Sequence, residues 1–173
     1  MGVWVEIWLA INRMLQRNGR NQINIDLARM GVWIETRDNN MQKEIYTNLY
    51  DNRLLKNNEE IEIFEENLEL LSETFTEEDI IELCSVFDDK TQDVEVMFGA
   101  IHLLETLSSE KAFENTINGV VEMSYKAPEW SNIIICRCLN DEFSVQMISK
   151  VQNKVDIKTY DRFKELLFRI KED

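Results

Sequence analysis

The stretch NNEEIEIFEENLELLSE, residues 57–73, decides the fold class of this 173-residue chain. Its apolar residues recur every three or four positions, which is the period of an α-helix with one buried face. These residues are Ile61, Phe64, Leu68 and Leu71. Asn57 or Asn58 stands where it can cap such a helix, and acids follow in the first turn, where the helix dipole favours them. The stretch therefore predicts an amphipathic helix with a strongly acidic outer side.

The rest of the chain shows the same helical character. One proline and five glycines are too few for the closely spaced turns of an all-β fold. Apolar spacing and capping residues predict helices over about 40–56, 58–73, 76–87, 94–107, 109–125, 128–139, 142–151 and 156–170. Short connections between such helices favour antiparallel neighbours. We therefore expect an all-α single domain of antiparallel helical hairpins stacked in a HEAT-like array, with about eight to nine helices in the whole chain.

Residues 1–40 differ in character from the rest. Residues 3–17 have helical apolar spacing, whereas residues 21–37 fit either a strand or a helix. The opening hexapeptide MGVWVE returns as MGVWIE from Met30, but two copies are fewer than the three stacked units that a solenoid needs. We therefore divide the chain into an N-terminal extension, helical with an ambiguous second half, and an acidic α-helical domain over 41–173.

The start of the chain does not have the features of a secretory signal. No basic segment precedes the apolar run, and Glu6 interrupts it. The run is also shorter than the roughly 20 residues that a membrane span requires. Three cysteines and a single histidine favour neither a disulfide framework nor a structural zinc site. We expect a cytoplasmic protein with reduced structural thiols at Cys84, Cys136 and Cys138.

Negative charge is concentrated in one part of the chain. The sequence holds 19 basic and 33 acidic residues, for a net charge of −14. Residues 58–110 contain 17 acids and one base, Lys90, whereas the segments before and after them are nearly balanced. Such a field repels nucleic acids and anionic membranes and attracts basic partners. The other interpretation is that the acids only solvate helix surfaces.

The stretch FDDKTQDVEVMFGAIHLLE, residues 87–105, allows a catalytic interpretation. Its acids could bind magnesium, which accepts a few carboxylates plus water. They are Asp88, Asp89, Asp93 and Glu95. Neither a Gly-rich phosphate loop nor a cluster of basic residues accompanies them, and a single histidine excludes an H-E-x-x-H pattern. Carboxylate-metal catalysis is therefore a minor alternative.

The same stretch also has a structural interpretation. Asp88 and Asp89 would end one helix, while Asp93 and Glu95 would favour the N-terminus of the next. On a helical wheel this next helix is apolar almost all round, except for a narrow strip that holds Glu95, Gly99, His102 and Thr106. We expect a central helix, a partly buried His102, and another helix or side chain that comes close to Gly99.

Several segments of the chain match the motifs of one known family. They are NRLLKNNEEIEIFEENLELLSE, ELCSVFDD and EVMFGAIHLLE, with weaker matches at Ala127-Pro-Glu-Trp130 and Arg137-Cys-Leu-Asn140. Over about residues 45–150 the chain resembles the bacterial polymorphic-toxin immunity proteins, specifically the immunity protein 30 family. Its motif residues, which we expect to be structural, are Phe87, Phe98, Gly99, His102 and Trp130.

The resemblance implies a cytoplasmic protein, without catalytic residues or cofactors, that neutralises a cognate secreted or contact-delivered toxin. From charge alone we infer that the toxin is a basic protein and that acids of the 58–95 segment contact it. The candidate contacts are Glu62, Glu66, Glu69, Glu77, Glu78, Asp88, Asp89, Asp93 and Glu95. An alternative is a helical-repeat adaptor or scaffold that binds a different basic protein; neither nucleic acid nor membrane is an expected partner.

Overall fold

The computed structural model describes residues 40–172 and divides the chain into two compact units, 1–43 and 44–173. The fold of the second unit is described here. The predictions for residues 3–17 and 21–37, and the MGVWVE/MGVWIE repeat, lie outside the described residues.

Every regular element between residues 40 and 172 is a helix. Residues 40–52 are helical, and the elements that follow are α3 (Asn58–Ser72), the short 3-10 helix η1 (Glu77–Asp79), α4 (Ile80–Val86), α5 (Val94–Glu105), α6 (Glu110–Met123), α7 (Pro128–Leu139), α8 (Glu142–Val151) and α9 (Ile157–Glu172). The all-α prediction is confirmed. None of these helices combines the length and the apolar character that crossing a bilayer requires.

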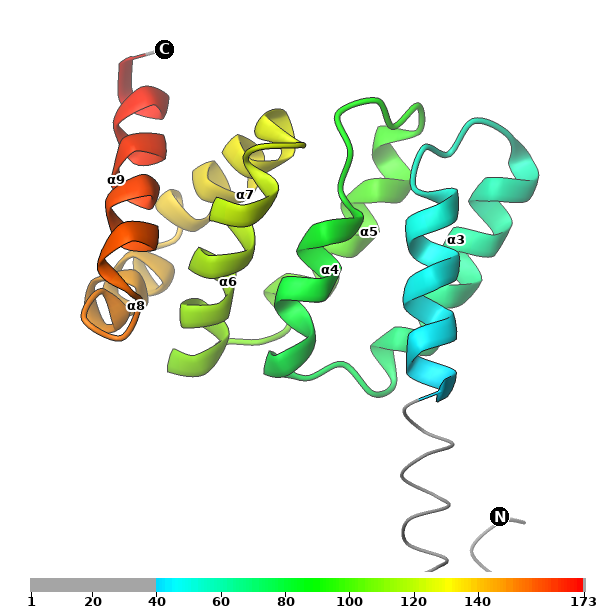
Figure 1. Ribbon diagram of the computed structural model, residues 1–173, viewed down its shortest axis with the longest axis horizontal. Helices are drawn as coiled ribbons and strands as arrows, with labels where there is room; N and C mark the ends of the chain where they lie inside the picture. Colours follow the sequence, from blue (N-terminus) through cyan, green and yellow to red (C-terminus); the bar gives the residue numbers. More distant parts are fainter. Residues whose placement is uncertain (1–39, 173) are drawn as a thin grey trace, which may run out of the picture. The chain divides into compact units, whose positions relative to one another are not determined.

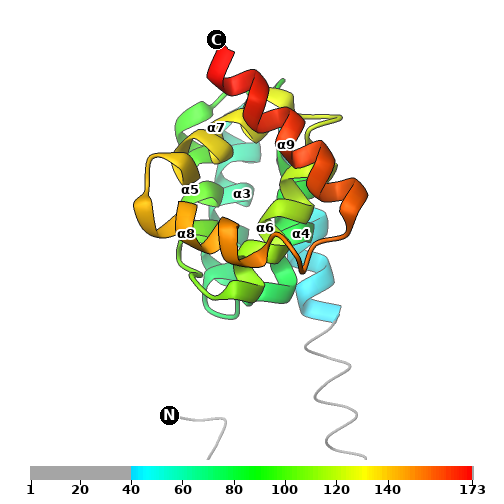
Figure 2. The same ribbon diagram turned by 90° about the vertical axis from the view of Figure 1, so that its left-hand side faces the viewer.

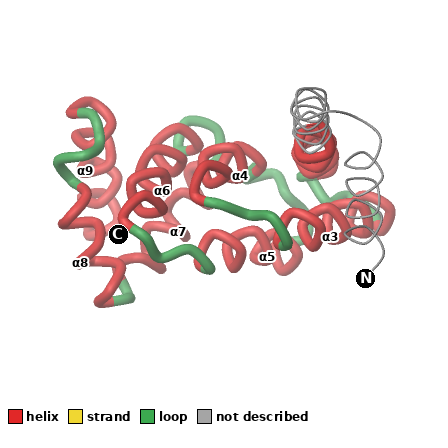
Figure 3. Tube along the Cα trace, turned by 90° about the horizontal axis from the view of Figure 1, so that it is seen from below, coloured by secondary structure: helices red, strands yellow, loops and turns green. Residues whose placement is uncertain are grey.

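Consecutive helices pair and stack into an array (Figure 1). Seen from below in Figure 3, α4 and α6 lie in one row, and α3, α5 and α7 lie in the other. Residue contacts join α4 to α6 within the first row and α3 to α5 within the second. At the end of the array, α8 and α9 both pack on α6 and α7 (Figure 2). This two-layered stack is the arrangement expected for the helical hairpins.

Local capping explains where most of the helices begin. The side chains of Asn57, Asp93 and Ser109 accept hydrogen bonds from backbone N–H groups in the first turns of α3, α5 and α6. Thr76 and Asp79 form a capping box before α4, and Pro128 occupies the first position of α7. One prediction is wrong: the first described helix ends near residue 52, not 56.

The backbone around Leu55 explains this earlier end. The N–H of Leu55 donates to the carbonyl oxygen of Asn52 at 3.0 Å, and Leu55 has a φ of 50°, which is incompatible with a continuing right-handed helix. The Leu55 side chain is nevertheless buried. Leu55 therefore fits the helical spacing of apolar residues in the sequence although it lies beyond the end of the helix.

One continuous hydrophobic core holds the layers together. Among its largest fully buried side chains are Phe64 of α3, Phe87 after α4, Met97 and Ile101 of α5, and Ile135 of α7. Because α5 buries residues on several sides and exposes only a narrow strip, it has the central position predicted from its apolar circumference. This strip and the outer side of α3 form the surface described next.

Candidate partner-binding surface

Five glutamates of α3 and Glu73, its C-cap residue, lie on one side of the helix and are called the α3 glutamates. At about 100° per residue they span an arc of roughly 120°, opposite the buried Phe64 and Leu71. They are Glu59, Glu62, Glu65, Glu66, Glu69 and Glu73, and all six are exposed. Within the described residues, their carboxylates make no hydrogen bond or ion pair with another side chain. The negative charge of α3 is thus available to a partner.

A shallow groove between α3 and α5 extends this charge onto the second helix. Glu65 and Glu69 of α3 face Glu95 of α5 across it, and the groove has a volume of about 510 Å³. We name the six α3 glutamates together with Glu95 the acidic surface. Glu95 is also exposed and makes no ion pair with the described residues.

The floor of the groove lies at Gly99 of α5, where Leu68 comes close to the backbone. A Cβ atom on Gly99 would lie 2.9 Å from Cδ2 of Leu68, so the end of this flexible side chain would have to move to admit a larger residue. This is the close approach expected from the sequence. His102, by contrast, was expected to be partly buried and is exposed at the edge of the groove, two turns after Glu95 on the same side of α5.

Asp88 is largely buried, and its carboxylate makes contacts within the fold. Its Oδ2 lies 3.2 Å from Nε of Arg53 and 3.9 Å from Nζ of Lys126, and its Oδ1 accepts the N–H of Lys90. Burial raises the pKa of this carboxyl, but the Lys90 hydrogen bond, the Arg53 contact and the charge of Lys126 outweigh it and hold the pKa below its usual value. Asp88 stays a predicted contact, but its carboxylate is already occupied.

Asp89 and Asp93 are occupied in the same way. Asp89 accepts the N–H groups of Glu129 and Trp130 at 3.1 and 3.3 Å, so it caps α7 from a distant part of the chain. Asp93 caps α5 by accepting the N–H of Val96 at 3.1 Å, as the structural interpretation of the sequence predicted. These two carboxylates connect or begin helices.

Of the remaining predicted contacts, one carboxylate is engaged within the fold and the others are exposed. Glu77 of η1 is half-buried and accepts a hydrogen bond from the Ser109 hydroxyl at 2.9 Å. A hydrogen bond from its own backbone N–H and the Ser109 bond lower the pKa of Glu77. Glu78 is exposed, as are Glu62, Glu66, Glu69 and Glu95. The structure therefore brings Glu69 and Glu95 to one groove, and it places Glu62 and Glu66 beside them on α3.

The aromatic motif residues pack against each other. Trp130 and Phe87 are buried, with ring centroids 5.6 Å apart, and Phe98 approaches Trp130 edge-on at 5.5 Å. The indole Nε1 of Trp130 donates to the backbone oxygen of Asp88. This cluster joins α5, α7 and the Phe87–Asp88 turn.

The described residues contain no group of three or more His, Cys, Asp or Glu side chains that could hold a metal ion. The three cysteines are unpaired. Burial raises the pKa of Cys84 to about 12 and that of Cys138 to about 11, so both are neutral thiols near pH 7. Protonated, buried thiols are poor nucleophiles, and this fits the structural role expected from the sequence.

The sequence model of the immunity protein 30 family matches residues 51–148. The chain belongs to this family. The match confirms the resemblance noted in the sequence, and it includes α3, α5 and the whole acidic surface. No curated protein and no solved structure matches the chain significantly. Membership of an immunity-protein family implies a protein partner, a toxin.

Three members of the acidic surface, Glu59, Glu65 and Glu73, were missing from the predicted contacts. Glu65 lies on the same arc as Glu62 and Glu69, so the helical wheel of α3 could have identified it. His102 was assigned to the structural motif, but it lies on the polar strip predicted for this helix, so the helical wheel could also have indicated its exposure.

Proposed function

We propose that this member of the immunity protein 30 family is a stoichiometric inhibitor that binds a basic bacterial toxin through the acidic surface. One observation carries the proposal: the six α3 glutamates are exposed on one side and unpaired within residues 40–172. Acids that only served folding would be engaged as Asp88, Asp89 and Asp93 are. The inhibitor would occlude the toxin sterically and have no catalytic activity of its own.

The physical basis is electrostatic capture by a preformed surface. Like charges held along one side of α3 create a local field that speeds encounter with a basic protein. Among residues 40–172 the α3 glutamates have no side-chain partner to give up, so a toxin's lysines and arginines gain ion pairs without breaking existing ones there. The packed core keeps α3 and α5 in a fixed relation, which lowers the entropic cost of binding.

Domain organisation and location follow from the same proposal. We assign toxin binding to residues 41–173, with 1–40 as an extension, and place the protein in the cytoplasm, where a delivered toxin would act. The family match lies within the assigned domain. Deletion of residues 1–39 should leave a chain that unfolds cooperatively and still binds toxin; loss of binding would contradict the assignment.

The test is growth rescue combined with physical capture. The product of the neighbouring toxin gene is expressed with and without this protein, and the complex is isolated through a tag on the toxin. We expect rescue of growth and a complex of fixed stoichiometry. Binding without rescue would favour the adaptor or scaffold alternative. Rescue by substoichiometric protein would indicate catalysis and contradict the proposal.

A further inference from the structure

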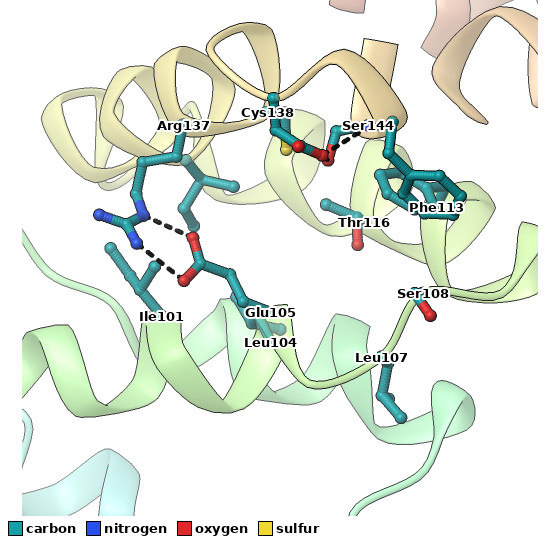
Figure 4. Close-up of a pocket in the computed structure, with 13 residues that line it drawn as sticks. Ile101, Leu104, Glu105, Leu107, Ser108, Phe113, Thr116, Arg137, Cys138 and Ser144 are labelled. Atoms are coloured by element: carbon teal, nitrogen blue, oxygen red, sulfur yellow. Dashed lines mark hydrogen bonds and ion pairs between the residues drawn. The ribbon is translucent and has the colours of Figure 1, made fainter. Parts of the chain in front are cut away.

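A pocket opens between α5, α6, α7 and α8, on a different side of α5 from the acidic groove (Figure 4). Its volume is about 280 Å³. A cavity of about 150 Å³ is enough to hold benzene, so this pocket has room for one aromatic side chain. The apolar residues that line it are Ile101, Leu104, Leu107, Phe113, Ile134 and Phe143.

An ion pair forms part of the pocket's mouth. Nη2 of Arg137 donates to Oε2 of Glu105 at 2.8 Å, and Nε of Arg137 donates to Oε1. Figure 4 shows this pair at one end of the pocket and Phe113 at the other. Asp141, at the start of α8, adds a second acid; hydrogen bonds from the hydroxyl and N–H of Ser144 lower its pKa and keep it ionised. The mouth therefore carries two acids and one base.

The pocket is within reach of a partner seated on the acidic surface. Glu105 at the mouth is ten residues after Glu95, a distance of about 15 Å along α5. The exposed His102 lies between them on the same helix. A typical protein interface buries about 800 Å² on each partner, which is wide enough to cover both places.

The lining of the pocket favours an anchor side chain. Phe143 is 49% exposed, and its ring meets Phe113 edge-on with centroids 6.1 Å apart. An entering ring would bury the exposed part of Phe143 and complete an aromatic stack. Apolar pockets with a charged rim are typical places for the anchors that dominate protein interfaces.

We propose that this pocket receives one aromatic side chain from a basic segment of the toxin. The proposal rests on the proposed function, since it uses the same partner. It adds an apolar anchor to the electrostatic contact, and it assigns to the partner an aromatic residue flanked by lysine or arginine. The basic flanks would lie at the mouth, where Glu105 pairs with Arg137 and Asp141 caps α8, so that these three groups carry a net charge of −1. The ring lies between Leu104, Phe113 and Ile134.

The first test uses the full ¹⁵N-labelled chain and three short peptides, acetylated and amidated: Arg-Trp-Arg, Arg-Ala-Arg and Glu-Trp-Glu. We expect Arg-Trp-Arg to shift the amide signals of residues around the pocket and to bind about tenfold more tightly than Arg-Ala-Arg, because the indole ring is buried. Glu-Trp-Glu should bind more weakly than Arg-Trp-Arg. Equal binding of the tryptophan and alanine peptides, or shifts away from the pocket, would overturn the proposal.

A second test fills the pocket. Thr116 is half-buried and lines the pocket from α6 (Figure 4), so Thr116→Phe should abolish the preference for the tryptophan peptide. Thr159→Phe on α9 makes the same chemical change at a half-buried position outside the pocket. This control variant should keep the preference for the tryptophan peptide. If circular dichroism shows that Thr116→Phe does not fold, the comparison of the tryptophan and alanine peptides on the wild-type chain still tests the pocket assignment.

Toxin binding separates the two proposals. If the wild-type chain does not bind the product of the neighbouring toxin gene, the proposed function fails, whatever the peptides show. If the wild-type chain binds that toxin, and folded Thr116→Phe and Thr159→Phe both bind it equally well, the pocket assignment alone fails. A loss of about tenfold or more in toxin affinity for Thr116→Phe only is the expected result.

Discussion

Asp88 and Asp89 are adjacent in the chain, but their carboxylates stabilise different parts of the fold. Asp88 pairs with Arg53 on the residues after the first described helix, and Asp89 caps α7 some forty residues later. Both contacts are long-range, so the sequence could indicate only that acids cluster near the end of α4. Asp93 could be predicted as a cap, because its acceptor role depends on residues three positions away.

Replacement of Asp89 by alanine should destabilise the protein. The change removes the acceptor for two N–H groups at the start of α7, and loss of a helix cap costs about 1–2 kcal/mol. Urea unfolding measures this loss. The control is Asp51→Ala at an exposed position, which should change the free energy of unfolding by less than about 0.5 kcal/mol. An equal effect of the two changes would contradict the capping role.

Asp88→Asn should destabilise the protein in a pH-dependent way. The folded-state pKa of Asp88 lies below the ordinary value of 3.8, so its ion pair with Arg53 contributes stability above that pH. That contribution is lost as the pH falls through the folded-state pKa. At pH 6 the variant should be less stable than wild type by about 1–3 kcal/mol, and the difference should shrink at pH 3. A difference that stays constant between pH 6 and pH 3 would refute this assignment.

At the scale of elements, close helix packing depends on two glycines with different neighbours. Gly99 of α5 faces only the end of the flexible Leu68 side chain. Gly119 of α6 faces Cys84, with Sγ 2.7 Å and Cβ 2.9 Å from the position of an added Cβ, and the Cα of Ile81 is 3.4 Å away. The Gly99 contact could be expected from the glycine's place in an apolar helix. The Gly119 contact could not, since it depends on how α4 lies against α6.

Gly119→Ala should therefore destabilise the protein, whereas Gly99→Ala should not. Crowding against Cys84 and α4 costs about 1–3 kcal/mol, of which the higher helix propensity of alanine offsets up to about 1 kcal/mol. At Gly99 the Leu68 side chain can move, so the propensity gain should leave stability unchanged or slightly higher. Thermal and urea unfolding of both variants measure this, and the reverse order would contradict the packing described.

Helix boundaries, too, could be predicted only where they depend on neighbouring residues. Starts are specified by neighbouring residues, so Asn57, Ser109 and Pro128 identify them correctly. The end of the first described helix was misplaced, because the buried Leu55 continues the apolar spacing although its backbone leaves the helix. Burial alone does not distinguish a helical residue from a turn residue packed under the same core.

On the scale of the whole molecule, the proposed function depends on which charges the fold leaves unpaired. The sequence locates the negative charge in residues 58–110 but does not separate acids that cap, pair or face solvent. Folding uses Asp79, Asp88, Asp89 and Asp93 internally and leaves the α3 glutamates and Glu95 exposed. What could be predicted was the sign and the segment of the acidic surface; its members required the packing of α3 on α5.

The most direct measurement is the affinity and association rate of the neighbouring toxin for two matched triple variants, at low and high salt. One carries Glu62→Gln, Glu66→Gln and Glu69→Gln on the acidic surface. The other carries Glu122→Gln, Glu129→Gln and Glu142→Gln, which are exposed acids elsewhere, and it makes the same change in net charge.

The account predicts that the first variant loses at least about tenfold in affinity and much of the salt dependence of the association rate, while the control stays within about threefold of wild type. Equal losses in both variants would mean that only net charge matters. That result, or no loss in the first variant, would contradict the acidic surface as the toxin-binding site.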